Sequence, residues 1–504
     1  MKKAIINGKI ILPNEIVENK ILLFDSKIIG IFDELPQNDG KDIQVINAKG
    51  KYVSPGLIDI HIHGNIGYDF MDVDLFEIEE IEKSIASKGV TGYLATTMTM
   101  NKEKIYNALD KIKKNMKLNI HRGAKPLGVH LEGPFLNEKY KGAQDSKFII
   151  PSSYDFIKEY EDIIKVITYA PENDKDLEFT KYISQNTNII LSMGHTNATY
   201  LEALEAINNG VKHATHLFNA MTGLNHRDPG VVGASLLSDN VKCELIADNI
   251  HVNKDLYELL VKSKGIENII LVTDSMEASN MCDGVYSIGG HPVKVENGSA
   301  RLVSNGVLAG SVLNLNTAIK NFYDNTSLKL NEVIRLSSLN PAKSLHIDDI
   351  KGSLEIGKDA DIAIFDENME CFMTIVEGEI KYEKLFNILD IKNKLSSLPN
   401  KIVKTMNGRT LSNEYGSYRG NYSNLYIEIN SNDKPSVTSY ELIELLNKSL
   451  KCGVMHGYKG GEFDIKEDTL VVLATYGEST GYYIKDIYID GDYIIIEHKE
   501  KDKL

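Results

Sequence analysis

The chain has 504 residues, of which 42% are hydrophobic and 25% are charged, which is ordinary for a soluble globular protein. This length exceeds one typical domain, although a single α/β barrel can account for half of it. The net charge of −15 at pH 7 argues against binding to nucleic acid or to an anionic membrane, because both need a basic field, so an anionic substrate would need a local cationic pocket.

Residues 1–54 have the pattern of short β-strands. Apolar stretches such as KAIINGKIIL are separated by the turn-forming pairs Asn7-Gly8 and Asp25-Ser26. The pattern returns at 352–385, with GSLEIGKDADIAIFD and FMTIVEGEIKYE. We predict that these two segments build one small β-domain.

Residues 55–351 alternate apolar strands with helical patterns such as DLFEIEEIEKSIASKG, which ends on Gly89 as helices commonly do. The predicted strands are 57–63, 92–98, 126–132, 165–172, 188–195, 211–218, 241–248 and 268–274. Eight such units predict a (β/α)8 barrel, whose active site lies at the carboxyl ends of the strands.

Residues 396–504 differ from the rest, because they begin with a polar segment and are rich in tyrosine. NLYIEIN and TLVVLATY are predicted strands, SYELIELLNKSLK is a predicted amphipathic helix, and a predicted hairpin turns at Asp490-Gly491. We predict a separate α+β accessory domain. A role in interaction or regulation and a purely structural role are equally compatible with this sequence.

Residues of the kind that bind metals close five of the eight predicted strands. They are His61 and His63 in DIHIHG, Glu132 in VHLEGP, His195 in LSMGHT, His216 in ATHLFNA and Asp274 in LVTDS. Because the carboxyl ends of barrel strands meet at one rim, this set predicts a metal-assisted hydrolase.

Some of these residues have more than one interpretation when taken alone. His61 and His63 share one face of a strand, but an isolated HxH is equally explained as polar loop residues. Glu132 could bridge two cations or serve one. Asp274 beside a metal could take a proton from water and pass it to a leaving group, whereas its competing interpretation is a helix N-cap.

The other histidines fit structural roles. His130 shares the face of Glu132 and is predicted to be buried and hydrogen-bonded, and His213 has the opposite parity to His216 and is predicted to point toward the helices. We expect the histidines outside the strand ends to be exposed: His121, His291, His346, His456 and His498.

Two loops carry candidate substrate contacts. FNAMTGLNHRDPG follows the sixth strand and includes Asn219, Ala220, His226 and Arg227, and IADNIHV places His251 after the seventh. An arginine and a histidine above a metal site indicate an anionic group on the substrate, such as phosphate. A surface pair between Arg227 and Asp228 is the alternative.

The cysteine pattern and the N-terminus bear on location. Four cysteines are scattered without a CxxC pair, which predicts reduced thiols and a cytoplasmic protein. The first apolar stretch is broken by Asn7, Gly8 and Lys9, unlike a signal peptide. No run of 18 apolar residues occurs, so we expect no membrane span.

At these motifs the chain resembles the N-acetylglucosamine-6-phosphate deacetylase family of the amidohydrolase superfamily. The matching segments are PGLIDIHIHG, GVHLEGPFLNEKYKGAQ, LSMGHTNATY, ATHLFNAMTGLNHRDPG, IADNIHV, LVTDSM and LAGS. They run in family order to about residue 385, and the C-terminal segment lies outside the resemblance.

The resemblance implies hydrolysis of the N-acetyl group of the 6-phosphate sugar, with one or two divalent ions per subunit, zinc being expected and iron the alternative. It implies one metal position at Glu132, His195 and His216, a second at His61 and His63 with Glu132 and Asp274 shared, and Asp274 as general base and then acid. The implied substrate contacts are Ala143, Asn219, Ala220, Arg227, His251, Leu308, Ala309 and Gly310. It further implies a homodimer, with Arg227 acting across the interface.

Two features depart from some family members. This chain retains the HxH pair that some members lack, which leaves one or two metals open, and it has Gln144 where some have a substrate-contacting histidine. The alternatives are an amidohydrolase for another acetylated amino sugar phosphate or a cyclic amide, and a non-catalytic binding protein on the same fold. Cyclic-amide hydrolases of the superfamily usually bridge their metals with a lysine, which Glu132 argues against, and a decayed barrel would have lost ligands.

Overall fold

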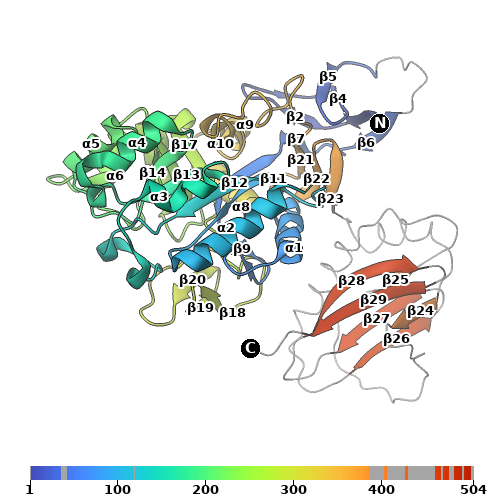
Figure 1. Cartoon of the computed structure of the whole chain (residues 1–504). Coiled ribbons are helices and arrows are strands. Elements are labelled where there is room, and N and C mark those ends of the chain that lie inside the picture. The colour runs from blue at the N-terminus through green and yellow to red at the C-terminus, as the bar shows by residue number, and fades with distance from the viewer. Residues whose placement is uncertain are drawn as a thin grey trace. The chain divides into compact units, whose positions relative to one another are not determined.

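The computed structural model describes residues 2–35, 43–118 and 120–384, together with the backbone of six strands beyond residue 400. The chain divides into two compact units, Met1–Tyr382 and Glu383–Leu504 (Figure 1).

The larger unit contains the predicted (β/α)8 barrel. Its eight parallel strands are hydrogen-bonded in chain order: β8 (Leu57–Ile62), β11 (Val90–Thr96), β12 (Lys125–Glu132), β13 (Ile164–Tyr169), β14 (Ile190–Met193), β15 (His213–Ala214), β16 (Lys242–Ile246) and β17 (Ile269–Val272). The barrel closes just beyond β17, where the Asp274 amide donates to the His61 carbonyl at 2.8 Å and the His63 amide to the Ser275 carbonyl at 2.9 Å. The predicted fold class is confirmed.

Several barrel strands end earlier than their apolar patterns predict, at the residues that point into the barrel mouth. His195, His216 and Asp274 have φ angles of +51°, +33° and +48°. Such left-handed backbone is unfavourable for residues other than glycine and costs about 1–3 kcal/mol at each position, so it persists only where the surrounding structure enforces it. At these three strands the strand pattern therefore stops two residues before the candidate ligand.

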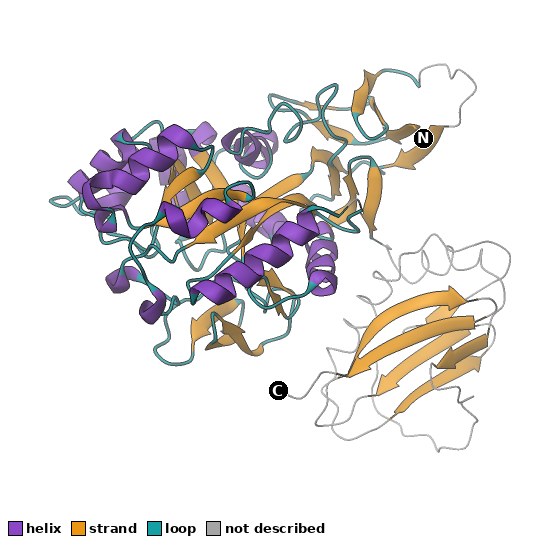
Figure 2. Cartoon of the chain, viewed as in Figure 1, coloured by secondary structure: helices purple, strands orange, loops and turns teal. Residues whose placement is uncertain are grey.

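A helix follows each barrel strand and covers its outer face (Figure 2). These helices are α1 (Leu75–Ala86), α2 (Lys102–Met116), α3 (Tyr154–Ile157), α4 (Glu178–Asn186), α5 (Tyr200–Asn208), α6 (Gly230–Leu237), α7 (Tyr257–Lys264) and α8 (Leu315–Asp324), and α9 (Leu330–Arg335) and α10 (Leu339–Ser344) follow. α1 begins at a capping box in which the Asp74 side chain accepts from the Glu77 amide while Glu77 accepts from the Asp74 amide.

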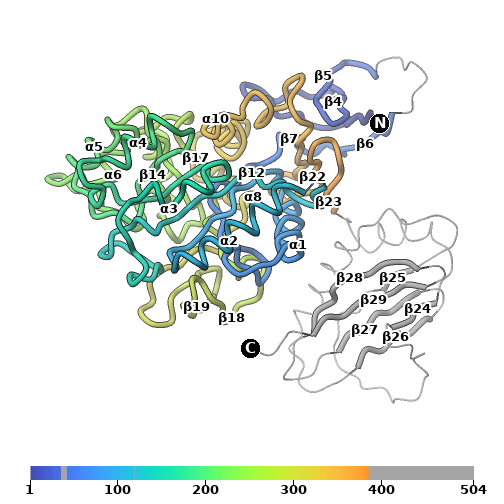
Figure 3. Tube along the Cα trace, viewed as in Figure 1, coloured from blue at the N-terminus to red at the C-terminus, as the bar shows by residue number. Residues whose placement is uncertain are grey.

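The two ends of the larger unit form two β-sheets. One sheet has the order β5-β4-β1-β6, and a second has the order β23-β22-β21-β7-β2-β3. The strands are β1 (Lys2–Ile6), β2 (Lys9–Ile11), β3 (Ile16–Val17), β4 (Ile21–Phe24), β5 (Ile28–Phe32), β6 (Ile43–Asn47), β7 (Tyr52–Pro55), β21 (Ile362–Phe365), β22 (Cys371–Val376) and β23 (Glu379–Glu383). β7 pairs in parallel with β2 and antiparallel with β21, which joins the blue and orange segments in Figure 3.

The sequence patterns did not predict a three-stranded antiparallel sheet inserted after β17. It consists of β18 (Gly284–Ile288), β19 (His291–Glu296) and β20 (Ser299–Leu302), and a two-stranded hairpin of β9 (Gly64–Asn65) and β10 (Tyr68–Asp69) follows β8. An isolated bridge between Arg301 and Leu308 connects β20 to the segment that returns to the barrel mouth. The insertion therefore contributes to the walls of the pocket described below.

The smaller unit contains two three-stranded sheets, ordered β24-β29-β28 and β25-β27-β26. Its strands are β24 (Ile402–Thr405), β25 (Tyr426–Glu428), β26 (Gly460–Lys466), β27 (Thr469–Thr475), β28 (Tyr482–Asp490) and β29 (Tyr493–Glu500). Asp490 pairs with Tyr493, which confirms the predicted hairpin. The predicted helix at 439–451 lies outside the described residues.

Among the described residues, no helix combines the length and the apolar character that crossing a membrane requires.

Candidate metal centre and active site

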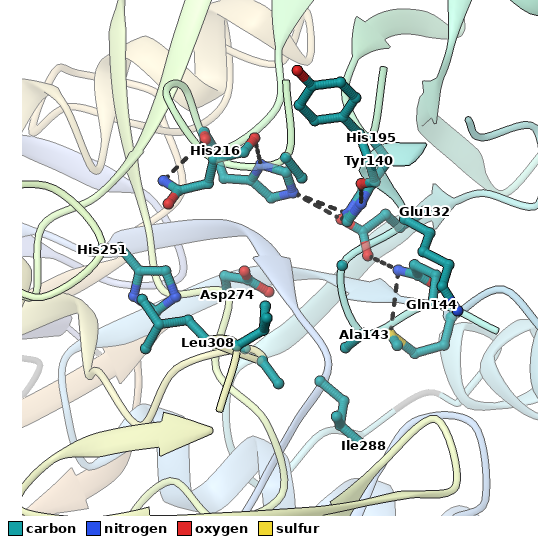
Figure 4. Close-up of a pocket in the computed structure, with 18 of the residues that line it drawn as sticks. Glu132, Tyr140, Ala143, Gln144, His195, His216, His251, Asp274, Ile288 and Leu308 are labelled. Carbon is teal, nitrogen blue, oxygen red and sulfur yellow. Dashed lines mark hydrogen bonds and ion pairs between the residues drawn. The ribbon is translucent and has the colours of Figure 1, made fainter. Parts of the chain in front are cut away.

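A pocket of about 590 Å³ opens at the carboxyl ends of the barrel strands (Figure 4). The predicted site residues that line it are His63, Glu132, Ala143, His195, His216, Asn219, Ala220, His251, Asp274, Leu308, Ala309 and Gly310. His61 is fully buried beneath this lining. The fold thus brings these positions together, whereas His226 and Arg227 are exposed and are not among the described residues that line the pocket.

His195, His216 and Glu132 form the first candidate ligand set. The Nε2 atoms of both imidazoles lie 3.3 Å from Oε1 of Glu132 and 3.3 Å from each other. The Nδ1 atom of His195 lies 2.9 Å from the Tyr140 carbonyl, and that of His216 lies 3.1 Å from the Asn219 carbonyl.

These backbone contacts fix the tautomer of both rings. A carbonyl only accepts, so each Nδ1 carries a proton, and Nε2 is the atom of each ring that can give a lone pair to a cation beside Glu132. In that state the two Nε2 atoms and Oε1 of Glu132 all face one point and none of them carries a hydrogen to donate. This donor set fits a divalent cation, for which imidazole and carboxylate are common ligands.

His61 and His63 form a second candidate set around the other side of Glu132. The His61 Nε2 lies 3.4 Å from Glu132 Oε1 and 3.4 Å from Asp274 Oδ1. The His63 Nε2 lies 3.4 Å from Glu132 Oε2 and 3.2 Å from Asp274 Oδ1. Both ligand sets therefore share Glu132, and Asp274 completes the second.

The electrostatics of the second set also favour bound positive charge. Burial alone would lower the pKa of His63, but the hydrogen bonds and charges of Asp274 and Glu132 raise it to about 9. Burial likewise opposes ionisation of Asp274, yet the charge of His61 and the hydrogen bond from His63 hold the pKa of Asp274 below its usual value. The two carboxylates thus attract positive charge to the point that a cation would occupy.

Gln144 holds the shared carboxylate in place. Its buried side chain donates from Nε2 to Glu132 Oε2 at 2.6 Å, and its Oε1 accepts from the Thr99 amide at 2.7 Å (Figure 4). The sequence left the effect of this residue open. In the structure it orients a candidate metal ligand from the side of the pocket.

Cationic and polar groups also line the pocket. His251 lines it, and its Nδ1 lies 2.7 Å from Asp248 Oδ2. Arg227 is exposed and is not among the described residues that line the pocket. Three cationic residues that the sequence analysis did not single out do line it: Lys139, Lys141 and Arg301. The two lysines lie in the GVHLEGPFLNEKYKGAQ segment, whereas only the inserted sheet brings Arg301 there.

The histidines outside the ligand sets were predicted to be either buried and hydrogen-bonded or exposed. His130 is buried, with Nδ1 3.0 Å from the Ile60 carbonyl and Nε2 2.7 Å from Thr168 Oγ1, as predicted. His346 is exposed as expected.

Two of the histidines expected at the surface are not exposed. The prediction for His121 was wrong, because its imidazole packs 3.3 Å from the buried carboxylate of Glu82. His291 is half-buried, since β19 pairs on both sides within the inserted sheet. His456 and His498 lie outside the residues whose side chains are described.

Comparisons with known proteins agree with this geometry. The amidohydrolase family model matches residues 52–393. An N-acetylglucosamine-6-phosphate deacetylase from Bacillus subtilis is 38% identical over 74% of this chain and 95% of its own length. An N-acetylgalactosamine-6-phosphate deacetylase from Escherichia coli O157:H7 is 32% identical over 67% of this chain and 90% of its own.

A solved structure extends the comparison to the fold. A point variant of N-acetyl-D-glucosamine-6-phosphate deacetylase from Mycobacterium smegmatis, in complex with N-acetyl-D-glucosamine-6-phosphate, superposes with a TM-score of 0.69 at 25% identity and covers 76% of this chain and 99% of its own. The chain belongs to the amidohydrolase family and, within it, to the N-acetylglucosamine-6-phosphate deacetylases.

Proposed function

We propose that this chain hydrolyses the N-acetyl group of N-acetylglucosamine 6-phosphate to give glucosamine 6-phosphate and acetate. The observation that carries the proposal is the pair of ligand sets that share Glu132 at the pocket, with Asp274 beside the second set in the same lining. The similarity to curated deacetylases over nearly their whole length supports the choice of substrate.

The proposed metal ligands follow from the two sets. Glu132, His195 and His216 would hold one divalent ion, and His61 and His63, with Glu132 and Asp274, would hold a second. Zinc suits this mixture of imidazole and carboxylate, with iron as the alternative. An ion bound here supplies Lewis-acid polarisation of the amide carbonyl and activation of water at neutral pH.

Asp274 is the proposed general base and then general acid. Its carboxylate is held ionised at the pocket and accepts a proton from the water that attacks the acetyl carbon. As the C–N bond breaks, Asp274 returns that proton to the sugar nitrogen, so that an amine and acetate leave.

The remaining lining residues would bind the sugar phosphate. Asn219 and Ala220, the Ala143 loop and the 308–310 segment surround the cavity, and His251 is proposed to contact the phosphate. Since Arg227 is exposed, it would act on the phosphate bound by a second copy of the chain, in a homodimer. A phosphorylated sugar is charged and does not cross membranes passively, which supports a cytoplasmic location.

Phosphate recognition gives a prediction on binding. His251→Ala and Arg227→Ala should each raise KM for the 6-phosphate sugar by about ten- to a hundred-fold, because a charge-assisted contact is worth roughly 1.5–3 kcal/mol. Steady-state kinetics of acetate release would measure this, with exposed His346→Ala as the control. Equal kcat/KM for N-acetylglucosamine without its phosphate would contradict phosphate recognition.

The sugar epimer is a second candidate for the specificity. The 32% identity to an N-acetylgalactosamine-6-phosphate deacetylase favours this alternative over other amides. Comparison of kcat/KM for the two 6-phosphate epimers tests it, and a higher value for the galactose form would replace the proposed substrate.

Residues 396–504 are proposed to be an accessory module rather than part of the active site. The Bacillus subtilis relative aligns over 95% of its length with 74% of this chain, so the comparable enzyme needs no such segment. A chain ending at Leu395 should therefore stay folded, bind metal and keep kcat within about twofold of the full chain, because the ligand sets lie in the larger unit. A folded, metal-loaded truncation without deacetylase activity would place part of the site in the C-terminal module.

A further inference from the structure

A second buried carboxylate, Glu244, lies inside the barrel beneath the metal centre. It stands on β16, is fully buried, and does not belong to the described residues that line the pocket. Its Oε2 lies 3.0 Å from Nδ1 of His61, the ring edge that faces away from Glu132 and Asp274.

This contact distinguishes His61 from the other candidate ligands. His195 and His216 are held at Nδ1 by neutral backbone carbonyls, whereas His61 is held by a carboxylate. His63 has no hydrogen-bond partner at Nδ1 among the described residues. Within the second ligand set, Glu244 is therefore the one described residue that contacts Nδ1 of a histidine ring.

The contact determines which lone pair His61 presents. An ionised carboxylate can only accept, so Nδ1 of His61 carries a proton, which leaves Nε2 as the ring atom that can give a lone pair to a cation beside Glu132 and Asp274. A carboxylate behind a ligating imidazole also orients the ring and makes it a stronger ligand. Glu244 is thus placed to serve the second ligand set.

A role for Glu244 as the partner of another histidine is less well supported by the geometry. Its Oε1 lies 3.6 Å from Nδ1 of His213, which is too far for a hydrogen bond, and neither atom has another such partner among the described residues. His213 is instead held through Nε2, which lies 2.5 Å from Ser344 Oγ on α10. His61 is therefore the residue that Glu244 positions.

We propose that Glu244 is a positioning residue that holds His61 for a second divalent cation, bound by His61, His63 and Asp274 with Glu132 shared. The inference rests on the proposed metal-dependent function and extends it, because it assigns the second ion its own buried anchor. It predicts that removing the charge of Glu244 weakens cation binding at the second position and leaves cation binding at the first position unchanged.

The test is a metal titration of the full-length protein with and without Glu244→Gln. Glutamine keeps the size and an accepting oxygen but removes the charge, so the fold should be kept. Zn²⁺ bound per chain is measured at buffered free-zinc concentrations. We expect two ions in the wild type, and in the variant about 10–100-fold weaker binding of one ion with the other unchanged.

A matched control comes from another buried carboxylate beside a histidine. Glu82 on α1 is 1% exposed and lies 3.3 Å from Nδ1 of His121, away from the pocket. Glu82→Gln removes an equally buried charge and should leave both zinc affinities unchanged. A loss of zinc in both variants would indicate a general disturbance of the barrel and overturn the proposal.

A second measurement keeps the proposal testable if Glu244→Gln does not fold. His61→Asn removes the ligand itself and should lose the same ion, and Glu244→Leu added to it should weaken zinc binding no further, because the two side chains act as one unit. Glu244→Asp, which keeps the charge, should bind the second ion more tightly than Glu244→Leu.

The outcomes separate this inference from the proposed function. Unchanged binding of two ions by Glu244→Gln, or one ion only in an active wild type, overturns the role of Glu244 and leaves the deacetylase proposal standing. A wild type that holds no zinc and releases no acetate overturns both.

Discussion

Asp274→Asn is expected to lower kcat for acetate release by about 10²–10⁴-fold, because the amide cannot take the proton that the carboxylate accepts. The proposed ion at Glu132, His195 and His216 should remain, since Asp274 belongs to the other ligand set. The expected signature is thus a folded protein that keeps this ion but turns over very slowly.

The asparagine replacement is well suited to this position. Asp274 has a φ of +48°, and asparagine tolerates the left-handed region better than most residues. Loss of activity can therefore be separated from misfolding by comparing the thermal unfolding of the variant with that of the wild type. A kcat close to the wild-type value at full metal content would show that Asp274 does not transfer the proton.

His195→Ala is expected to remove most of the bound metal and most of the activity. It deletes one of the three donors of the first ligand set, whose ring lies at the pocket and not in the apolar core. Loss of even a residue that supports a ligand weakens metal binding by about 10–100-fold, so loss of the ligand itself should cost at least as much.

Metal content and acetate release together measure this effect, with exposed His346→Ala as the control. The variant should remain folded, because the barrel core does not include the His195 ring. Full activity in a His195→Ala protein without metal would refute the proposed metal chemistry.

The barrel could be predicted because its strands are buried on both faces and therefore form apolar runs. All residues of β8, β11 and β17 are buried, and these runs stood out between helical patterns. The strand ends could not be predicted, since left-handed backbone at His195 and His216 is enforced by tertiary contacts. The inserted sheet at 284–302 was missed because its strands are short and lack the continuous buried runs of the barrel strands.

The candidate ligands could be predicted because they follow or end barrel strands, and the carboxyl ends of barrel strands lie next to one another in space. The residues that hydrogen-bond to these ligands, such as Gln144, could not be predicted, since hydrogen bonds between side chains of different strands and loops leave no periodic pattern in the sequence. Glu244 did leave a signal: it is a carboxylate in the middle of the predicted strand VKCELIAD, where a buried charge requires a partner. Arg301 left none, because the inserted sheet alone brings it to the pocket.

The most direct test is a deacetylation assay on the purified, zinc-loaded protein with N-acetylglucosamine 6-phosphate. We expect acetate and glucosamine 6-phosphate in equal amounts, loss of both after removal of the metal with a chelator, and their return when zinc or iron is added back. Failure of the folded, metal-loaded protein to release acetate, or undiminished release by the metal-free protein, would contradict the proposed function.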